Sequence, residues 1–179
     1  MTDNADNEEI VIKKDISLIL ATSTDYGIGF ENKMCWNIPE ELQSFRNITS
    51  CVKDKNKKNC VIMGKNTWYS LPKPPLKNRI NIIISSNDYE KLNKEIDCEN
   101  MNDVKVFRNI RDTLLYVNES DIIESAFIIG GAQLYNDFLD NHISDINYIY
   151  FTIVFDKKYE FYKHVAANII FDNFKFEQH

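Results

Sequence analysis

The chain has 179 residues, of which 44% are hydrophobic and 27% charged, and its formal net charge is −6. This length and composition are ordinary for one soluble globular domain, and the acidic balance argues against nucleic acid as the main partner. No apolar run is long enough to span a membrane, and the acidic start does not resemble a signal peptide. The four cysteines form no CxxC pair, which favours a reduced, cytoplasmic compartment and gives no sign of a metal site.

The first ordered element is predicted at residues 15–22. Residues 1–14 are polar and acidic, and we expect them to form a loose tail before a single domain over residues 15–179. The segment 15–22 (DISLILAT) is apolar on both sides, which is typical of a central parallel strand. The loop that follows, residues 23–36, is long and contains two glycines, and long loops in compact domains are often functional.

The next segment is predicted to be a helix that has Asn37 as its cap and Pro39 in its first turn, and that ends near Thr49. Its apolar residues recur at spacings of three and four and share one face: Leu42, Phe45 and Ile48. Glu41 points toward that face, where a carboxylate is costly to bury unless it is paired or protonated. Glu40 and Glu41 are also favourable simply as acids at a helix N-terminus, although the inward direction of Glu41 fits that interpretation less well.

Strands and helices alternate through the rest of the chain. Further strands are predicted at residues 59–63, 80–84, 104–107, 126–129 and 147–154, and helices at 65–71, 110–117 and 132–139. Residues 88–103 are polar and are expected to be looped or loosely helical. Residues 169–177 alternate between polar and apolar types, as in a last, antiparallel strand. This order predicts an α/β fold with a mostly parallel central β-sheet flanked by helices and an antiparallel C-terminal strand.

The five glycines lie near the ends of predicted strands, which is where ligands bind on sheets of this kind. In residues 126–135 an apolar strand runs into Gly130-Gly131 and then into a helix start, whose free N–H groups attract phosphate. A tight strand-to-helix turn without a ligand explains this stretch alone equally well, because short glycine motifs are weak evidence. Gly64, followed by Lys-Asn-Thr at residues 65–67, is a second helix start of the same kind.

Four blocks of the chain occur in the order and spacing of one known family: residues 27–45, 61–72, 75–85, and 127–135 followed by 149–152. The first block reads GIGFENKMCWNIPEELQSF and the second VIMGKNTWYSLP. Together the blocks resemble the dihydrofolate reductases, most closely those of protozoa and related eukaryotes, in which the reductase can be fused to thymidylate synthase. We expect only the reductase domain here.

The resemblance implies an NADPH-dependent enzyme of one-carbon metabolism that reduces 7,8-dihydrofolate to 5,6,7,8-tetrahydrofolate and is a target of antifolates. Glu41 matches the acid that binds the pterin and assists protonation of its N5. Trp36 matches the tryptophan that holds an ordered water beside the pterin, and Thr152 matches the threonine that hydrogen-bonds the acid. Four further residues match positions that line the folate pocket: Ile19, Ala21, Leu42 and Phe45. Arg79 matches the arginine that binds the α-carboxylate of the glutamate tail.

On the cofactor side, the resemblance assigns residues from three strand ends. The pyrophosphate-binding turn of the family corresponds here to Gly130, Gly131, Ala132, Gln133 and Leu134. The position near the nicotinamide corresponds to Tyr135. The other matches are Ile28, Gly64, Lys65, Asn66 and Thr67, with Ser85 and Ser86 at the edge near the adenosine 2′-phosphate. Lys65 keeps the charge that favours NADPH over NADH, and Arg108 is a further candidate there. The peptide between Gly130 and Gly131 is expected to be cis, as in the family.

The chain departs from the family pattern at three places. Cys35 replaces the usual proline before Trp36, Gln133 replaces a residue that is often basic or small, and the stretch between Thr152 and the last strand is shorter than usual. Three alternatives therefore stay open: a degenerate member that binds folate or nucleotide with little catalysis, a related reductase of another heterocycle, or a simple nucleotide-binding module. We expect a cytoplasmic monomer, unless it associates with a thymidylate synthase.

Overall fold

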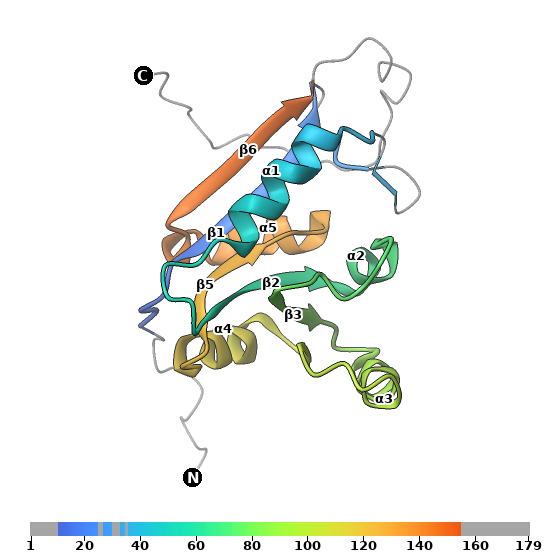
Figure 1. The fold of residues 1–179 in the computed structure, drawn as a ribbon, viewed down its shortest axis with the longest axis vertical. Coiled ribbons are helices and arrows are strands. Elements are labelled where there is room, and N and C mark those ends of the chain that lie inside the picture. The colour runs from blue at the N-terminus through green and yellow to red at the C-terminus, as the bar shows by residue number, and fades with distance from the viewer. Residues whose placement is uncertain (1–10, 25–26, 30–32, 35, 155–179) are drawn as a thin grey trace.

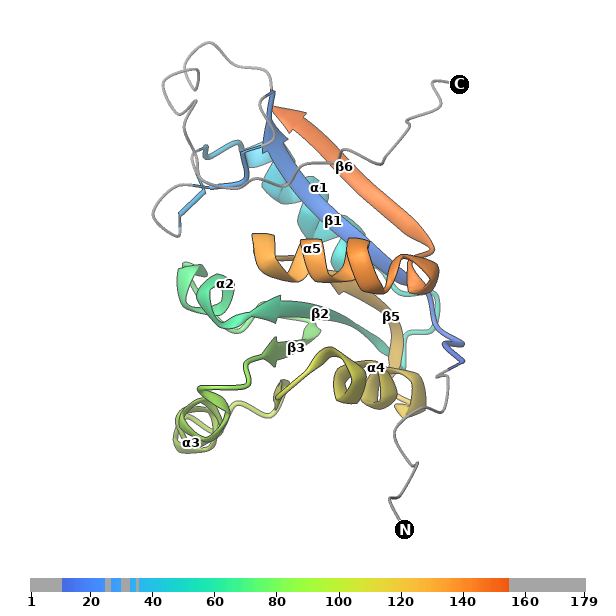
Figure 2. The same cartoon turned by 180° about the vertical axis from the view of Figure 1, so that it is seen from behind.

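The fold is seen in a computed structural model that describes residues 11–24, 27–29, 33–34 and 36–154. These residues form a six-stranded sheet with helices on both faces (Figures 1 and 2). The strands are β1 (Ile16–Ser23), β2 (Lys58–Gly64), β3 (Arg79–Ile84), β4 (Val104–Phe107), β5 (Ile123–Ile128) and β6 (Tyr148–Val154). The helices are α1 (Pro39–Ser50), α2 (Lys65–Ser70), α3 (Tyr89–Cys98), α4 (Ile110–Glu119), α5 (Ala132–Asn141) and the short 3-10 helix η1 (Ile143–Asp145).

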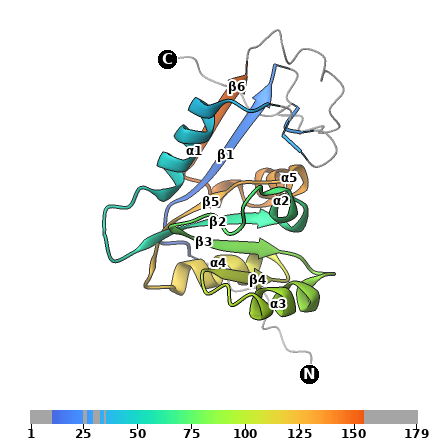
Figure 3. The same cartoon turned by 45° about the vertical axis from the view of Figure 1, so that its right-hand side comes forward.

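The strand order is β4-β3-β2-β5-β1-β6, and every neighbouring pair is parallel. The predicted α/β architecture with a parallel central sheet is therefore confirmed for the part of the chain that the structure describes. The antiparallel strand expected at residues 169–177 lies outside the described residues. Because the strands are parallel, their carboxyl ends meet at one edge, and Figure 3 shows the arrowheads of β2 and β3 there, close to α2.

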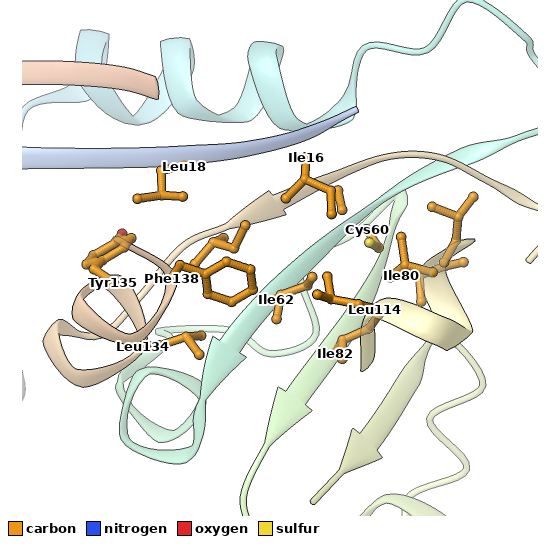
Figure 4. Packing of buried hydrophobic residues seen from close by; sticks show 14 of the residues in the cluster. Ile16, Leu18, Cys60, Ile62, Ile80, Ile82, Leu114, Leu134, Tyr135 and Phe138 are labelled. Carbon is orange, nitrogen blue, oxygen red and sulfur yellow. The ribbon is translucent and has the colours of Figure 1, made fainter. Parts of the chain in front are cut away.

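The central strands are buried on both faces because each alternate side chain enters one of two cores. In β2, Cys60 and Ile62 pack with α4 and α5, whereas Val61 and Met63 pack with α2 and α3 on the other face. Figure 4 shows the first core, in which Phe138 of α5 is fully buried against strand residues. Helices thus cover both faces of the sheet. The carboxyl edge of the sheet is the part that can carry a functional site.

The structure differs from the prediction at α1. Its cap is Ile38 rather than Asn37, and no side chain caps the helix. The buried face of α1 carries Phe45 and Thr49, whereas Leu42 is 43% exposed. Successive helical residues are rotated by about 100°, so Leu42 lies at the margin of a stripe that runs through Glu41, Phe45 and Ile48.

Other elements also differ from the prediction. The polar segment expected to be looped or loosely helical contains the regular helix α3, because Leu92 and Ile96 are four residues apart and both are buried. Strand β5 begins at Ile123, three residues earlier than predicted. The helix α4 also extends to Glu119, past the predicted end at residue 117.

The loop after α1 is held by Glu124 of β5. Its carboxylate accepts the backbone N–H groups of Lys53 and Asp54 at 2.8–3.0 Å, and these bonds hold the pKa of Glu124 below its usual value. We expect Glu124→Gln to lower the free energy of unfolding at pH 7 by about 0.5–1 kcal/mol, because the site is exposed and its interactions are screened.

The pH dependence of this effect has a definite sign. A carboxyl group with a depressed pKa in the folded state contributes stability above its unfolded pKa and loses it as the pH falls through the folded value. The difference between wild type and Glu124→Gln should therefore shrink on acidification, as measured by urea unfolding between pH 7 and pH 3. A difference that is the same at all pH values would contradict this explanation.

Candidate active site

Two glycine-containing strand ends meet at the carboxyl edge of the sheet. The N–H of Gly64 donates to the carbonyl oxygen of Gly130 at 2.8 Å. A Cβ atom added to Gly131 would lie 3.3 Å from Oγ1 of Thr67, so the two turns are packed against each other. The peptide between Gly130 and Gly131 is cis, as expected, and Gly130 has φ of +106°. Only glycine adopts that conformation without strain, which explains its place here.

Tyr135 connects this turn to β1. Its hydroxyl donates to the carbonyl oxygen of Ile19 at 2.8 Å, and its ring lies 2.9 Å from where a Cβ on Gly130 would stand. The side chain lies between α5 and β1 (Figure 4). Burial raises the pKa of the Tyr135 phenol far above its usual value, and the nearby Glu41 carboxylate raises it further. Tyr135 is therefore a neutral hydrogen-bond donor that ties the glycine turn to the region around Glu41.

Glu41 points inward from the first turn of α1, as predicted. Its Oε2 atom is buried and has no hydrogen-bond partner among the residues that the structure describes, and burial raises the pKa of the carboxyl group. Trp36 is 6% exposed, and its Nε1 atom also lacks a partner among those residues. Buried polar atoms are nearly always hydrogen-bonded in native proteins, so unpartnered ones mark a place where a polar ligand or water binds.

Two further atoms of this kind were not anticipated from the sequence. One is Oδ1 of Asn59, at the start of β2 and so away from the carboxyl edge. The other is Oγ1 of Thr22, which is fully buried near the carboxyl end of β1 and has no partner in the described part of the chain. A threonine in an apolar run is typical of any strand, so nothing in the sequence marked Thr22 as special. Thr152 pairs with Ala21 in the register between β6 and β1, but it is exposed. No hydrogen bond within the described residues joins Thr152 to Glu41, so its assigned role stays a prediction.

Arg79 lies under the C-terminal half of α1. It is only 4% exposed, its Nη1 donates to Oγ1 of Thr49 at 2.7 Å, and its Nε donates to the carbonyl oxygen of Lys77 at 3.1 Å. Its guanidinium carbon lies 5.8 Å from the centre of the Phe45 ring. Burial, with a contribution from Arg46, lowers the pKa of Arg79, although a guanidinium stays charged at neutral pH.

No carboxylate forms a salt bridge with Arg79 among the residues that the structure describes. A buried guanidinium without an acidic partner is costly, and it is suited to a bound carboxylate that offers two oxygens. Thr49 orients this arginine by accepting a hydrogen bond from it, a contact that no pattern in the sequence indicated. Of the other substrate-side residues, Ile19 and Phe45 belong to the same core, Ala21 is half-buried, and Leu42 is exposed at the margin.

A polar cluster lies at the carboxyl ends of β2, β3 and β4. Lys65 Nζ forms an ion pair with Asp88 Oδ2 at 2.5 Å, and the N–H of Asp88 donates to Oγ of Ser85 at 3.2 Å. Arg108 pairs with Glu90 at 2.6 Å. The structure thus brings Lys65 and Ser85 into one neighbourhood, as the resemblance implied, and adds Asp88, which the sequence did not indicate.

Comparison with known proteins identifies the family of this chain. The family model for dihydrofolate reductase matches residues 15–177. The chain belongs to the dihydrofolate reductase family. It is 36% identical over 134 residues to the dihydrofolate reductase of Candida albicans, a match that covers 73% of this chain and 65% of the relative.

Two further relatives also carry a dihydrofolate reductase name. The dihydrofolate reductase of Saccharomyces cerevisiae is 33% identical over 126 residues, which are 68% of this chain and 57% of the relative. The bifunctional dihydrofolate reductase-thymidylate synthase 2 of Arabidopsis thaliana is 32% identical over 141 residues, which are 73% of this chain and 24% of the relative. The chain thus spans less than two thirds of the length of these relatives.

Two features are absent from the described residues. None of the described helices has the length and apolar character needed to cross a membrane. Within the same residues, histidine, cysteine and acidic side chains do not gather in groups of three or more that could hold a metal ion. Cys35 and the shortened stretch after Val154, two of the departures from the family pattern, lie outside the described residues.

Proposed function

We propose that this member of the dihydrofolate reductase family reduces 7,8-dihydrofolate to 5,6,7,8-tetrahydrofolate with hydride from NADPH. The observation that carries the proposal is the half-buried carboxyl group of Glu41, whose Oε2 has no hydrogen-bond partner in the described residues and whose pKa is raised. Such a group holds a proton at pH values where an exposed carboxyl has lost it, and it can both bind an aminopterin ring and assist its protonation. Trp36 supports this role, because its unpartnered Nε1 can hold a water molecule beside the ring.

The residues at the glycine turn fit NADPH. The turn at Gly130 and Gly131 leads directly into α5, whose first N–H groups have no capping side chain among the described residues and would be available to a pyrophosphate. Lys65 and the two serines at residues 85–86 would face the adenosine 2′-phosphate, and Tyr135 would lie beside the nicotinamide. When bound, NADPH supplies the hydride that is added to the pterin. The hydrogen-bonded side chain of Tyr135 and the packed turn would hold the nicotinamide ring in a fixed position relative to the pterin ring.

The decisive experiment is an assay of the full chain with dihydrofolate, in which oxidation of NADPH is followed by its absorbance. We expect turnover with NADPH and slower turnover with NADH. Tight binding of an antifolate such as methotrexate without oxidation of NADPH would instead support the second possibility, a degenerate member that binds folate without useful catalysis. Absence of both turnover and antifolate binding would reject the proposal.

We also propose that Arg79 binds the α-carboxylate of the glutamate tail. Arg79→Lys keeps the positive charge but removes the flat, two-point contact of the guanidinium. We therefore expect the KM for dihydrofolate to rise about 10- to 100-fold with a smaller change in kcat. A dihydropterin that lacks the tail should be reduced equally by both proteins.

A matched control for this prediction is Arg46→Lys. Arg46 is exposed on α1 and near Arg79, so the substitution makes the same chemical change without touching the buried position. We expect it to leave the KM unchanged. An equal loss of activity toward the tailless dihydropterin in Arg79→Lys would mean that Arg79 supports the fold rather than the tail.

The remaining features of the protein follow from the same proposal. We propose that residues 15–179 form one domain and that residues 169–177 add an antiparallel strand, because β6 exposes Tyr148, Tyr150 and Ile153 at one end of the described strand order. We also propose a cytoplasmic monomer, which the free cysteines at positions 51, 60 and 98 support. Light scattering of the purified chain tests the monomer, and association with a thymidylate synthase would appear as a larger complex.

A further inference from the structure

The ion pair between Lys65 and Asp88 lies where the proposed function needs an anion-binding lysine. The Nζ to Oδ2 distance is 2.5 Å, and the side chains are 38% and 27% exposed, so this pair is better shielded from water than the pair of Arg108 with Glu90. A shielded ion pair is weakened less by solvent and salt than an exposed one. Lys65 is therefore already engaged by a carboxylate before any phosphate arrives.

Asp88 is not needed in its charged form to build helix α3. It occupies the cap position, but its side chain makes no capping hydrogen bond. The contacts of its backbone hold the turn instead, because its N–H donates to Ser85 Oγ and its carbonyl oxygen accepts the N–H of Leu92 at 2.9 Å. An asparagine at this position keeps both backbone contacts and is itself a favourable cap.

The charges around the cluster cancel. Lys65 and Arg108 are each paired with one carboxylate, and both carboxylates, Asp88 and Glu90, come from the start of α3. A phosphate monoester carries about −1.5 to −2 charges at pH 7. It would meet a site of zero formal charge, with a carboxylate next to its principal cation. Asp88 must either release Lys65 or repel the phosphate, and both alternatives weaken binding.

We propose that Asp88 is a specificity-determining residue that competes with the 2′-phosphate of NADPH for Lys65, and so reduces the preference of this site for NADPH over NADH. The inference rests on the proposed function, since it concerns the same cofactor site. The carboxylate of Asp88 is also suited to accept a hydrogen bond from the 2′-hydroxyl of NADH, a contact that acidic residues make in other dinucleotide sites. One residue thus acts against one cofactor and in favour of the other.

The test measures binding of two small probes to the full chain by isothermal titration calorimetry. Adenosine 2′,5′-bisphosphate carries the 2′-phosphate, and adenosine 5′-monophosphate lacks it. We expect Asp88→Asn to strengthen binding of the bisphosphate by roughly three- to tenfold, which is the size of effect expected from one partly exposed ion pair. Binding of the monophosphate should stay the same or weaken.

Two further variants make the result specific. Asp97→Asn removes the same charge from an exposed position near the other end of α3, and it should change neither affinity. In a Lys65→Gln background, Asp88→Asn should lose its effect on the bisphosphate, because the competition for Lys65 no longer exists. Asp88→Ser, which retains a capping side chain, serves as a second variant if the asparagine protein does not fold.

The outcomes separate the inference from the proposed function. An unchanged or smaller ratio of bisphosphate to monophosphate affinity in Asp88→Asn, in a protein that still oxidises NADPH with dihydrofolate, would overturn the role of Asp88 alone. A gain of equal size in Asp97→Asn would also overturn it, because the effect would then be one of net charge. If neither the wild type nor Asp88→Asn bound the bisphosphate and NADPH were not oxidised, both the inference and the proposed function would fail.

Discussion

Replacement of Glu41 by glutamine is expected to lower kcat/KM for dihydrofolate reduction by about 10²- to 10⁴-fold, the usual contribution of a positioned general acid. Glutamine has nearly the same shape, so the pocket is retained, but its amide cannot assist protonation of the pterin. Glutamine also presents an N–H donor in place of one carboxylate oxygen, and this weakens binding of the ring amino group. Normal turnover by Glu41→Gln would remove the basis for the assigned role.

The same substitution should make the folded protein more stable at neutral pH. Burial raises the pKa of Glu41, so the folded state holds a proton at pH values where the unfolded chain has lost it. The free energy of unfolding of the wild type therefore falls as the pH rises above the ordinary carboxyl pKa toward the raised value in the folded state. Glutamine does not titrate, so the stability advantage of Glu41→Gln should grow with pH over that window.

These two effects of Glu41→Gln are checked by steady-state kinetics and by urea unfolding at pH 5 and pH 8. Glu40→Gln is the matched control, because Glu40 is the neighbouring residue in the same helical turn but is exposed. We expect Glu40→Gln to leave the activity unchanged. In the wild type, kcat/KM should decline as the pH rises through the raised pKa of Glu41, since the proton needed by the pterin is then lost.

Replacement of Gly130 by alanine is the second change with a large expected effect. The φ angle of +106° is unfavourable for any residue with a Cβ, and the added atom would lie 2.9 Å from Cε2 of Tyr135. Tyr135 is 4% exposed and bonded to the carbonyl oxygen of Ile19, so its ring cannot move without breaking a buried hydrogen bond. We expect a loss of about 2–4 kcal/mol in the free energy of unfolding.

Cofactor binding should also weaken when this turn is displaced. If NADPH binds against the backbone of Gly130 and Gly131, a shifted turn should weaken its affinity more than 100-fold, as titration by fluorescence or calorimetry would show. The matched control for stability is Gly64→Ala, whose Cβ would have only ordinary contacts at 4.0 Å. Gly64→Ala should unfold almost like the wild type. Equal stability of the two variants would show that neither the φ angle of Gly130 nor its contact with Tyr135 is limiting.

Several elements could be predicted from the sequence because they depend on local patterns. The apolar runs of β1, β2, β3 and β4 are where they were expected, because a strand buried on both faces must be apolar throughout. The inward direction of Glu41 followed from its spacing to Phe45 on a helix. Two predictions were wrong where the pattern was ambiguous. Leu42 was placed on the buried face of α1 but lies one position from it. The segment that forms α3 was not predicted as a regular helix, because it is mostly polar and has only two buried positions.

The sequence by itself determined a parallel α/β sheet, an acid that faces inward from α1 and a glycine turn at a strand end, because each of these depends on residues close together in the chain. Only the tertiary structure decided which groups are partners. Tyr135 and Ile19 are 116 positions apart, Arg79 and Thr49 are 30 apart, and Asp88 and Lys65 are 23 apart. Such pairs depend on the order β4-β3-β2-β5-β1-β6, which sets the neighbours at the edge of the sheet. Local periodicity carries information on burial but none on strand order, and strand order decides which charged side chains lie together at the carboxyl edge of the sheet.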